Sequence, residues 1–220
     1  MIISHKHKFI VINIPKTGTN AYSHAIHSIG IIPDIQGGTA VNHGFYQHDT
    51  ASSVKNKLKK IGHNWEKYYS IARVRNPWKF YASLFYWHLK NYNDVTNEKI
   101  RDTLTNQQYK TKRYSAELFI ENRFKEDKIM SILVRDSIPQ CEYFTENNKI
   151  IVSHVGLFEN LQEEFNDFCQ KINVKPIHLE KLNASPSYNY KDLYENCPTL
   201  IEQVAQKEHF VISLKKYKYD

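Results

Sequence analysis

The sequence predicts an α/β fold in which a central, mainly parallel sheet is flanked by helices. Two observations support this fold class. The β-branched run Phe9–Ile14 leads through a glycine-containing turn into a helical pattern, and the apolar run Tyr68–Val74 leads in the same way into a helix that begins at Pro77. Repeated strand–loop–helix order is typical of parallel sheets that bind ligands at the carboxyl ends of their strands. We find no repeat, linker or composition break, so we expect a single domain, residues 1–220.

The helix after the first strand is predicted from apolar side chains that recur on one face, from Ala21 to Ile29. It ends near Gly30, and either Thr19 or Asn20 is expected to cap its start. The order of strand, turn and helix is that of a nucleotide-binding unit.

Two more helices in the first half begin with clear start signals. One covers 49–60, with Asp49 or Thr50 as its N-cap. The other covers 77–92 and begins with a proline behind Asn76, which is a favourable N-cap residue before a first-turn proline.

The second half of the chain shows weaker patterns, apart from one clearly amphipathic helix. We predict helices over 93–111, 116–124, 161–172 and 198–214, and strands over 140–143 and 150–155 that flank a turn at 146–148.

Composition favours a folded protein with anionic partners. Hydrophobic residues make up 41% of the chain, and the formal net charge is +7. Such a charge suits phosphate-bearing cofactors, acidic glycans, anionic membranes or nucleic acid, but does not choose among them. The three cysteines, Cys141, Cys169 and Cys197, show no disulfide or metal-ligand spacing, and no apolar run is long enough for a membrane span. We therefore expect a soluble cytoplasmic protein that binds no metal.

The turn Pro15–Asn20, which we call the first anion segment, has the residues of an anion-binding loop. Unpaired backbone N–H groups at a helix start attract anions. Gly18 allows close backbone approach, Thr17 and Thr19 offer hydroxyl donors, and Lys16 adds a charge. The segment is no Walker A loop, because its lysine precedes its only glycine. An ordinary strand-to-helix turn with an exposed lysine remains an alternative.

Arg75-Asn76-Pro77 repeats this arrangement after the second strand, and we call its first two residues, Arg75 and Asn76, the second anion segment. The strand is expected to deliver Arg75 to the carboxyl edge of the sheet, where its guanidinium can grip a phosphate with two hydrogen bonds. Ser83 follows about two helical turns later and offers a hydroxyl donor. A capped helix with an incidental arginine is the alternative.

Together the two segments resemble those of the superfamily of sulfotransferases that use 3′-phosphoadenosine 5′-phosphosulfate (PAPS). The wider chain looks similar to the carbohydrate (family 2-like) branch, through the stretch from Gln140 to Phe-Glu-Asn-Leu at 158–161 and the region after His178. The resemblance implies a three-layer fold like that of the P-loop NTPases. It also implies that Lys16, Thr17, Gly18, Thr19 and Asn20 bind the 5′-phosphosulfate, and that Arg75 and Ser83 bind the 3′-phosphate.

A sulfuryl transfer needs in-line geometry, charge neutralisation on the leaving phosphate and a base for the acceptor hydroxyl. Lys16 is the candidate for the leaving-group role. His48 is the candidate base and His43 the alternative, because neutral imidazole suits proton abstraction near pH 7. Both histidines can equally be loop residues without a catalytic role.

The acceptor is expected to be a carbohydrate or another hydroxyl-bearing molecule. Aromatic residues within 77–92 can stack on a sugar, although their helical spacing favours a place in the core: Trp78, Tyr81, Tyr86 and Trp87. Three other functions remain open: a catalytically inactive PAPS-binding homologue, a P-loop-like kinase and a nucleic-acid-binding module. The sequence contains no recognised nucleic-acid motif and no convincing Mg²⁺ ligand set, which disfavours the last two functions.

Overall fold

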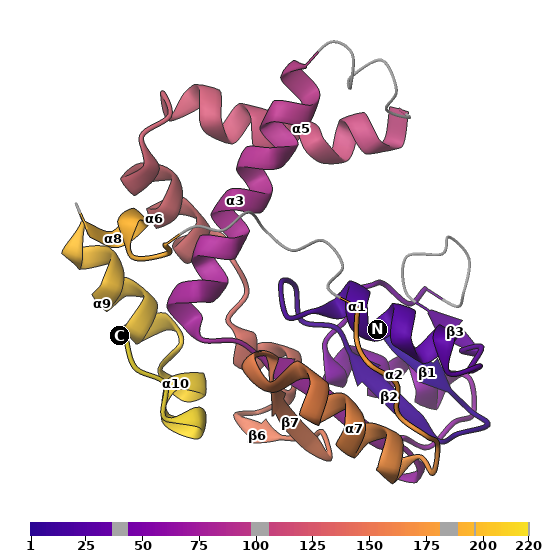
Figure 1. Ribbon diagram of the computed structural model, residues 1–220. Helices are drawn as coiled ribbons and strands as arrows, with labels where there is room; N and C mark the ends of the chain where they lie inside the picture. Colours follow the sequence, from indigo (N-terminus) through magenta and orange to yellow (C-terminus); the bar gives the residue numbers. More distant parts are fainter. Residues whose placement is uncertain (37–43, 98–105, 181–188, 196, 220) are drawn as a thin grey trace. The chain divides into compact units, whose positions relative to one another are not determined.

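The chain divides into two compact units, and the single domain expected over residues 1–220 stays a prediction. The sheet unit contains Met1–Asn76 and Ile138–Ala184, and the helical unit contains Pro77–Ser137 and Ser185–Asp220. The units arise because the chain leaves the sheet at Pro77 and returns at Ile138. Each is described by itself. The computed structural model (Figure 1) describes residues 1–36, 44–97, 106–180, 189–195 and 197–219.

The sheet unit is built on a mixed five-stranded sheet of order β3-β1-β2-β4-β7. Strand β2 pairs in parallel with β4, and β4 with β7, while β1 is antiparallel to both β2 and β3. The expected α/β class is confirmed, with a mixed rather than mainly parallel sheet. The antiparallel β1 was not predicted from sequence. The strands are β1 (Ile2–Ser4), β2 (Phe9–Ile12), β3 (Ile35–Gln36), β4 (Tyr69–Val74) and β7 (His154–Leu157).

Helices α1 (Thr19–Ser28) and α7 (Leu161–Lys171) cover one face of this sheet (Figure 1). Both lie close to the predicted helices at these places. Their apolar faces meet the strands in a fully buried aromatic cluster, in which Phe9 and Phe168 pack edge to face with ring centroids 5.0 Å apart. Tyr22 of α1 packs against Phe165 in the same way, at 5.1 Å. This cluster anchors α1 directly behind the first anion segment.

The remaining elements of the sheet unit are short, apart from α2. The strand predicted at 140–143 is wrong, because these residues form a 3₁₀ turn whose Gln140 side chain is buried. The turn at 146–148 is confirmed, and its left-handed Asn147 and Asn148 suit a tight hairpin. The elements are α2 (Ala51–Lys60), η1 (Trp65–Lys67), η2 (Gln140–Tyr143), β5 (Thr145–Glu146), β6 (Lys149–Ile150) and η3 (Phe158–Asn160).

In its described residues the helical unit contains α-helices joined by turns and no strand. The single last helix predicted over 198–214 is two helices, which meet at the fully buried Glu208. Trp78 and Tyr81 are buried, as their spacing indicated, and the Tyr81 hydroxyl donates to Glu208 Oε1 at 3.2 Å. Across the described residues, no helix is long and apolar enough to cross a membrane. The helices are α3 (Pro77–Thr96), α5 (Asn106–Glu121), α6 (Glu126–Asp136), α8 (Asp192–Glu195), α9 (Pro198–Lys207) and α10 (His209–Lys215).

Candidate functional site

Three loops meet at the carboxyl edge of the sheet, because β2, β4 and β7 are parallel neighbours. Ile12 is in register with Ala72, and Val74 with Leu157. The first anion segment therefore follows β2 beside the second anion segment, which follows β4. The turn η3 follows β7 at the same edge. The expected delivery of Arg75 to this edge is confirmed.

The backbone of the first anion segment is shaped to present N–H groups. Lys16 and Gly18 have positive φ angles of 61° and 77°, and Thr17 between them does not. Such alternation of backbone regions forms concave N–H nests that bind anions. Gly18 is the N-cap of α1 and, as a glycine, has no side chain that could cap this helix end. The predicted cap at Thr19 or Asn20 is wrong, because the left-handed glycine ends the turn instead.

The threonine hydroxyls of the first anion segment fold the loop. Thr17 Oγ1 donates to the Ile14 carbonyl at 2.8 Å, and Thr19 Oγ1 donates to the same oxygen at 3.2 Å. Thr17 is fully buried, whereas Asn20 is exposed in the first turn of α1. In this structure the two hydroxyls therefore point inward, where the sequence suggested donors for a ligand. The backbone N–H groups and Lys16 are the segment's candidate ligand contacts.

Gly18 is required by close packing as well as by its φ angle. A Cβ atom at this position would lie 2.8 Å from Leu161 Cδ2 and 3.2 Å from Phe158 Cε2. Both neighbours belong to the Phe-Glu-Asn-Leu stretch at 158–161. That stretch therefore supports the first anion segment directly, a role that the sequence resemblance did not reveal.

Arg75 joins the two anion segments. Its Nη1 donates to the Lys16 carbonyl at 3.2 Å, and its guanidinium carbon lies 4.5 Å from the centroid of the Phe158 ring. The arginine is half-buried. Two segments separated by about sixty residues thus meet at one edge of the sheet, as the sequence predicted from their common architecture.

Two side chains, of which Gln140 is buried and Glu159 is exposed, hold the backbone of the second anion segment. Gln140 accepts the Arg75 N–H at 2.9 Å and donates to the Arg75 carbonyl at 3.1 Å. Glu159 Oε1 accepts the Asn76 N–H at 2.8 Å. Because Gln140 is fully buried, these bonds fix the point from which the guanidinium extends. Sequence reasoning missed both supporting residues, since nothing local marks a contact over 65 residues.

His48 lies in the same sheet unit with a defined tautomer. Its Nδ1 is 2.7 Å from the Asn13 carbonyl, which can only accept a hydrogen bond. Nδ1 therefore carries the proton, and Nε2 is the basic nitrogen of the neutral ring. Desolvation lowers the pKa of His48 below its ordinary value; the hydrogen bond to Asn13 offsets part of this effect, and the charges of the N-terminal amine and Lys16 add to it. This histidine stays neutral, and so able to accept a proton, at a lower pH than a free imidazole.

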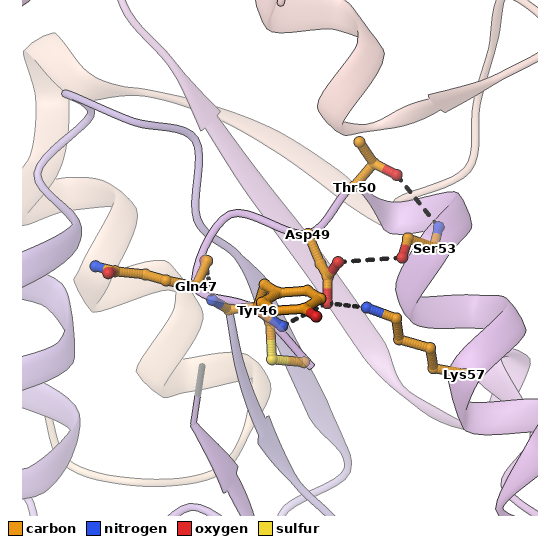
Figure 2. Close-up of polar contacts among 7 residues, drawn as sticks. Tyr46, Gln47, Asp49, Thr50, Ser53 and Lys57 are labelled. Carbon is orange, nitrogen blue, oxygen red and sulfur yellow. Dashed lines mark hydrogen bonds and ion pairs between the residues drawn. The ribbon is translucent and has the colours of Figure 1, made fainter. Parts of the chain in front are cut away.

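The turn that carries His48 is fixed by the side chain of Asp49 (Figure 2). Asp49 Oδ2 accepts the Tyr46 N–H at 2.7 Å and pairs with Lys57 Nζ at 2.6 Å, while Oδ1 accepts the Ser53 hydroxyl at 3.1 Å. Thr50 is the N-cap of α2, as predicted, and accepts the Ser53 N–H at 3.2 Å. His48 therefore lies in a turn whose backbone is held in place by the hydrogen bonds and ion pair of Asp49.

The other two predicted residues are placed differently. Ser83 lies on α3 in the helical unit, where only 2% of it is exposed. His43 lies outside the described residues. Lys16, Thr17, Gly18, Thr19, Asn20, Arg75 and His48 all belong to the sheet unit.

Two cavities of the sheet unit lie along α7 and the segment that follows it. One of about 490 Å³ is lined by residues from Asn166 to Pro176, and one of about 290 Å³ lies between β4, β7 and α7. Neither is lined by Lys16, Arg75 or His48. The candidate site is therefore a loop surface at the edge of the sheet and not one of these two cavities.

Comparisons with protein-family models, with curated proteins and with solved structures returned no match for this chain. The functional assignment therefore depends on the residues and geometry of the site.

Proposed function

We propose that this protein is a PAPS-dependent sulfotransferase with a P-loop-like three-layer fold, and that its acceptor is a hydroxyl group of a carbohydrate. The observation that carries the proposal is the contact between Arg75 Nη1 and the Lys16 carbonyl at 3.2 Å, beside a helix end whose N-cap residue, Gly18, has no side chain. This edge has the chemistry to hold two anionic groups of one ligand. PAPS has two such groups, at its 5′ and 3′ positions.

In this proposal the first anion segment holds the 5′-phosphosulfate. The backbone N–H groups after Lys16 receive the charged oxygens, and Lys16 neutralises the charge that grows on the leaving phosphate. Arg75 holds the 3′-phosphate. Sulfuryl transfer then breaks the bond between sulfur and the bridging oxygen of the 5′-phosphate and forms a bond between sulfur and the acceptor oxygen.

His48 receives the proton of the acceptor hydroxyl in this scheme. Its Nδ1–H is already committed to the Asn13 carbonyl, so Nε2 is the nitrogen that accepts the proton. The products are the sulfate ester, adenosine 3′,5′-bisphosphate and a protonated His48, which returns the proton to water. No metal takes part in the proposed step.

A sulfation assay tests the proposal directly. The protein is incubated with PAPS labelled in its sulfuryl group and a panel of glycans, lipids and tyrosine peptides, and products are detected by mass spectrometry. We expect a labelled glycan with wild-type protein and none with Lys16→Ala. Transfer by Lys16→Ala at the wild-type rate would overturn the assignment.

The same panel separates the alternatives. Binding of adenosine 3′,5′-bisphosphate without transfer to any acceptor would support an inactive homologue. Phosphate transfer from ATP in place of sulfuryl transfer would support a P-loop-like kinase.

A further inference from the structure

Arg73 is a fully buried cation beneath the candidate site. It lies in β4 two residues before Arg75, and only 1% of it is exposed. Its side chain is on the face of the sheet that α1 covers, where the guanidinium carbon is 3.8 Å from the centroid of the Tyr22 ring. The Tyr22 N–H bonds to the Gly18 carbonyl at 3.1 Å and so closes the first turn of α1. The guanidinium therefore lies under the helix end that the first anion segment forms.

By distance and angle, none of the three guanidinium nitrogens of Arg73 has a hydrogen-bond partner among the described residues, although the Tyr22 side chain lies near enough to stabilise its charge. Arginine offers five N–H donors, and buried charges in proteins are normally paired and hydrogen-bonded. Stacking on an aromatic ring offsets only part of the loss of hydration. A buried arginine of this kind needs an explanation, such as an anion that completes it.

Neighbouring elements supply little compensating charge. Desolvation lowers the pKa of Arg73, and Tyr22 and Glu164 offset part of that effect. The Glu164 carboxylate is already engaged on β7, where it accepts the Leu157 N–H at 2.8 Å and lies 2.7 Å from His154 Nε2. Along the edge above, Lys16 and Arg75 add further positive charge.

Asn13, which directly follows β2, is a second buried polar residue beside Arg73. It follows Ile12, whose register partner is Ala72, so Asn13 is level with Arg73 on the neighbouring strand. Its side chain is buried, and its Oδ1 also has no hydrogen-bond partner in the part of the chain that the structure describes. The Asn13 amide is neutral and its Oδ1 accepts rather than donates hydrogen bonds, so this residue supplies no counter-charge to the guanidinium beside it.

We infer that Arg73 is a buried counter-charge for the anion that binds the first anion segment. It does not touch the ligand and acts through the first turn of α1, so it is a positioning residue. The bound anion compensates the guanidinium, and the guanidinium in turn raises affinity for the anion. The identity of that anion as the phosphosulfate of PAPS depends on the proposed function.

Two substitutions separate charge from packing. Arg73→Met keeps a long side chain and loses the charge, while Arg73→Lys keeps a charge at the same place. Binding of adenosine 3′,5′-bisphosphate, inorganic pyrophosphate and uncharged adenosine is measured by calorimetry, and melting temperature is measured without ligand. Tyr22→Phe is the control, because it keeps the stacked ring.

We expect Arg73→Met to weaken binding of both anionic ligands by about tenfold, the order of effect of one nearby charge in a partly screened interior. Adenosine binding should not change, and the ligand-free melting temperature should stay equal or rise, because an unpaired buried charge is removed. Arg73→Lys should bind the anions within about threefold of wild type.

Several results would overturn the inference. They are unchanged anion binding in Arg73→Met, equal losses in the Met and Lys variants, or a Met variant that does not fold, since each makes the role purely structural. If pyrophosphate binding depends on Arg73 but the bisphosphate gains nothing over pyrophosphate, the inference stands and the PAPS assignment fails. If wild type binds neither anion, both fail.

Discussion

The two anion segments differ in which part of the chain is prepared for a ligand. In the first, left-handed residues at Lys16 and Gly18 shape the backbone, and the threonine hydroxyls donate inward to Ile14. In the second, Gln140 and Glu159 bond to the backbone, and the Arg75 side chain extends over Phe158. One segment offers backbone N–H groups and the other offers a guanidinium. The difference suggests two phosphate sites with separate tasks.

The largest effect is expected at the reacting end of the first anion segment. Lys16→Ala should lower kcat by roughly 10³-fold, because the charge that develops on the leaving phosphate is no longer neutralised. Lys8→Ala is the matched control, since Lys8 is also a left-handed lysine, with φ 52°. The measurement is steady-state sulfation. Equal losses in both variants would mean that backbone strain and not charge explains the effect.

The variant His48→Ala should lower kcat about 10²-fold, which is within the usual range for the loss of a general base. A base works in its neutral form, and desolvation lowers the pKa of His48 from its ordinary value of 6.5. The acid limb of the kcat/KM profile should therefore fall below pH 6.5 in wild type and vanish in the variant. A profile that keeps its limb in His48→Ala would assign the base elsewhere, with His43→Ala as the next variant.

Gly18→Ala tests the backbone of the first anion segment. The strained φ angle and the contact with Leu161 should together reduce the free energy of unfolding by about 1–3 kcal/mol and weaken ligand binding. Gly30→Ala isolates the strain, because Gly30 has a similar φ of 81° and no atom within 4 Å of an added Cβ. Equal melting temperatures in the two variants would show that steric contact with Leu161 and Phe158 does not add to the cost of an added Cβ at Gly18.

Gln140→Met tests the backbone support of the second anion segment, with the smallest expected effect. It leaves the buried Arg75 N–H and carbonyl without this partner, which should cost about 1–3 kcal/mol of stability. KM for PAPS should rise more than kcat falls, because the support positions a binding residue. A variant with lowered kcat and unchanged KM would contradict this division of tasks.

Local patterns predicted the parts of the fold that carry the site. The strands Phe9–Ile12 and Tyr69–Val74 and the helix Thr19–Ser28 follow from short apolar runs and a glycine turn. Strand β1 was missed because three residues give little periodic signal and its pairing is tertiary. The strand predicted at 140–143 failed for a related reason, since the Gln140 side chain is committed to Arg75 far away in sequence.

The site was predictable only where a residue's chemistry is visible locally. Lys16, Gly18 and Arg75 stand in recognisable segments, and the structure brings them together. Phe158, Glu159 and Arg73 contact residues of other elements that are distant in sequence, which no local pattern encodes. The inward direction of the threonine hydroxyls was equally hidden, because it depends on where the Ile14 carbonyl lies.

One measurement tests the two-phosphate account most directly: calorimetric affinities of adenosine 3′,5′-bisphosphate and adenosine 5′-monophosphate for wild type, Lys16→Met and Arg75→Met. The account predicts that wild type prefers the bisphosphate. Lys16→Met should weaken both ligands alike, because both carry the 5′-phosphate. Arg75→Met should weaken the bisphosphate alone, by about tenfold or more. Equal wild-type affinities, or an Arg75→Met loss that is the same for both ligands, would contradict the account.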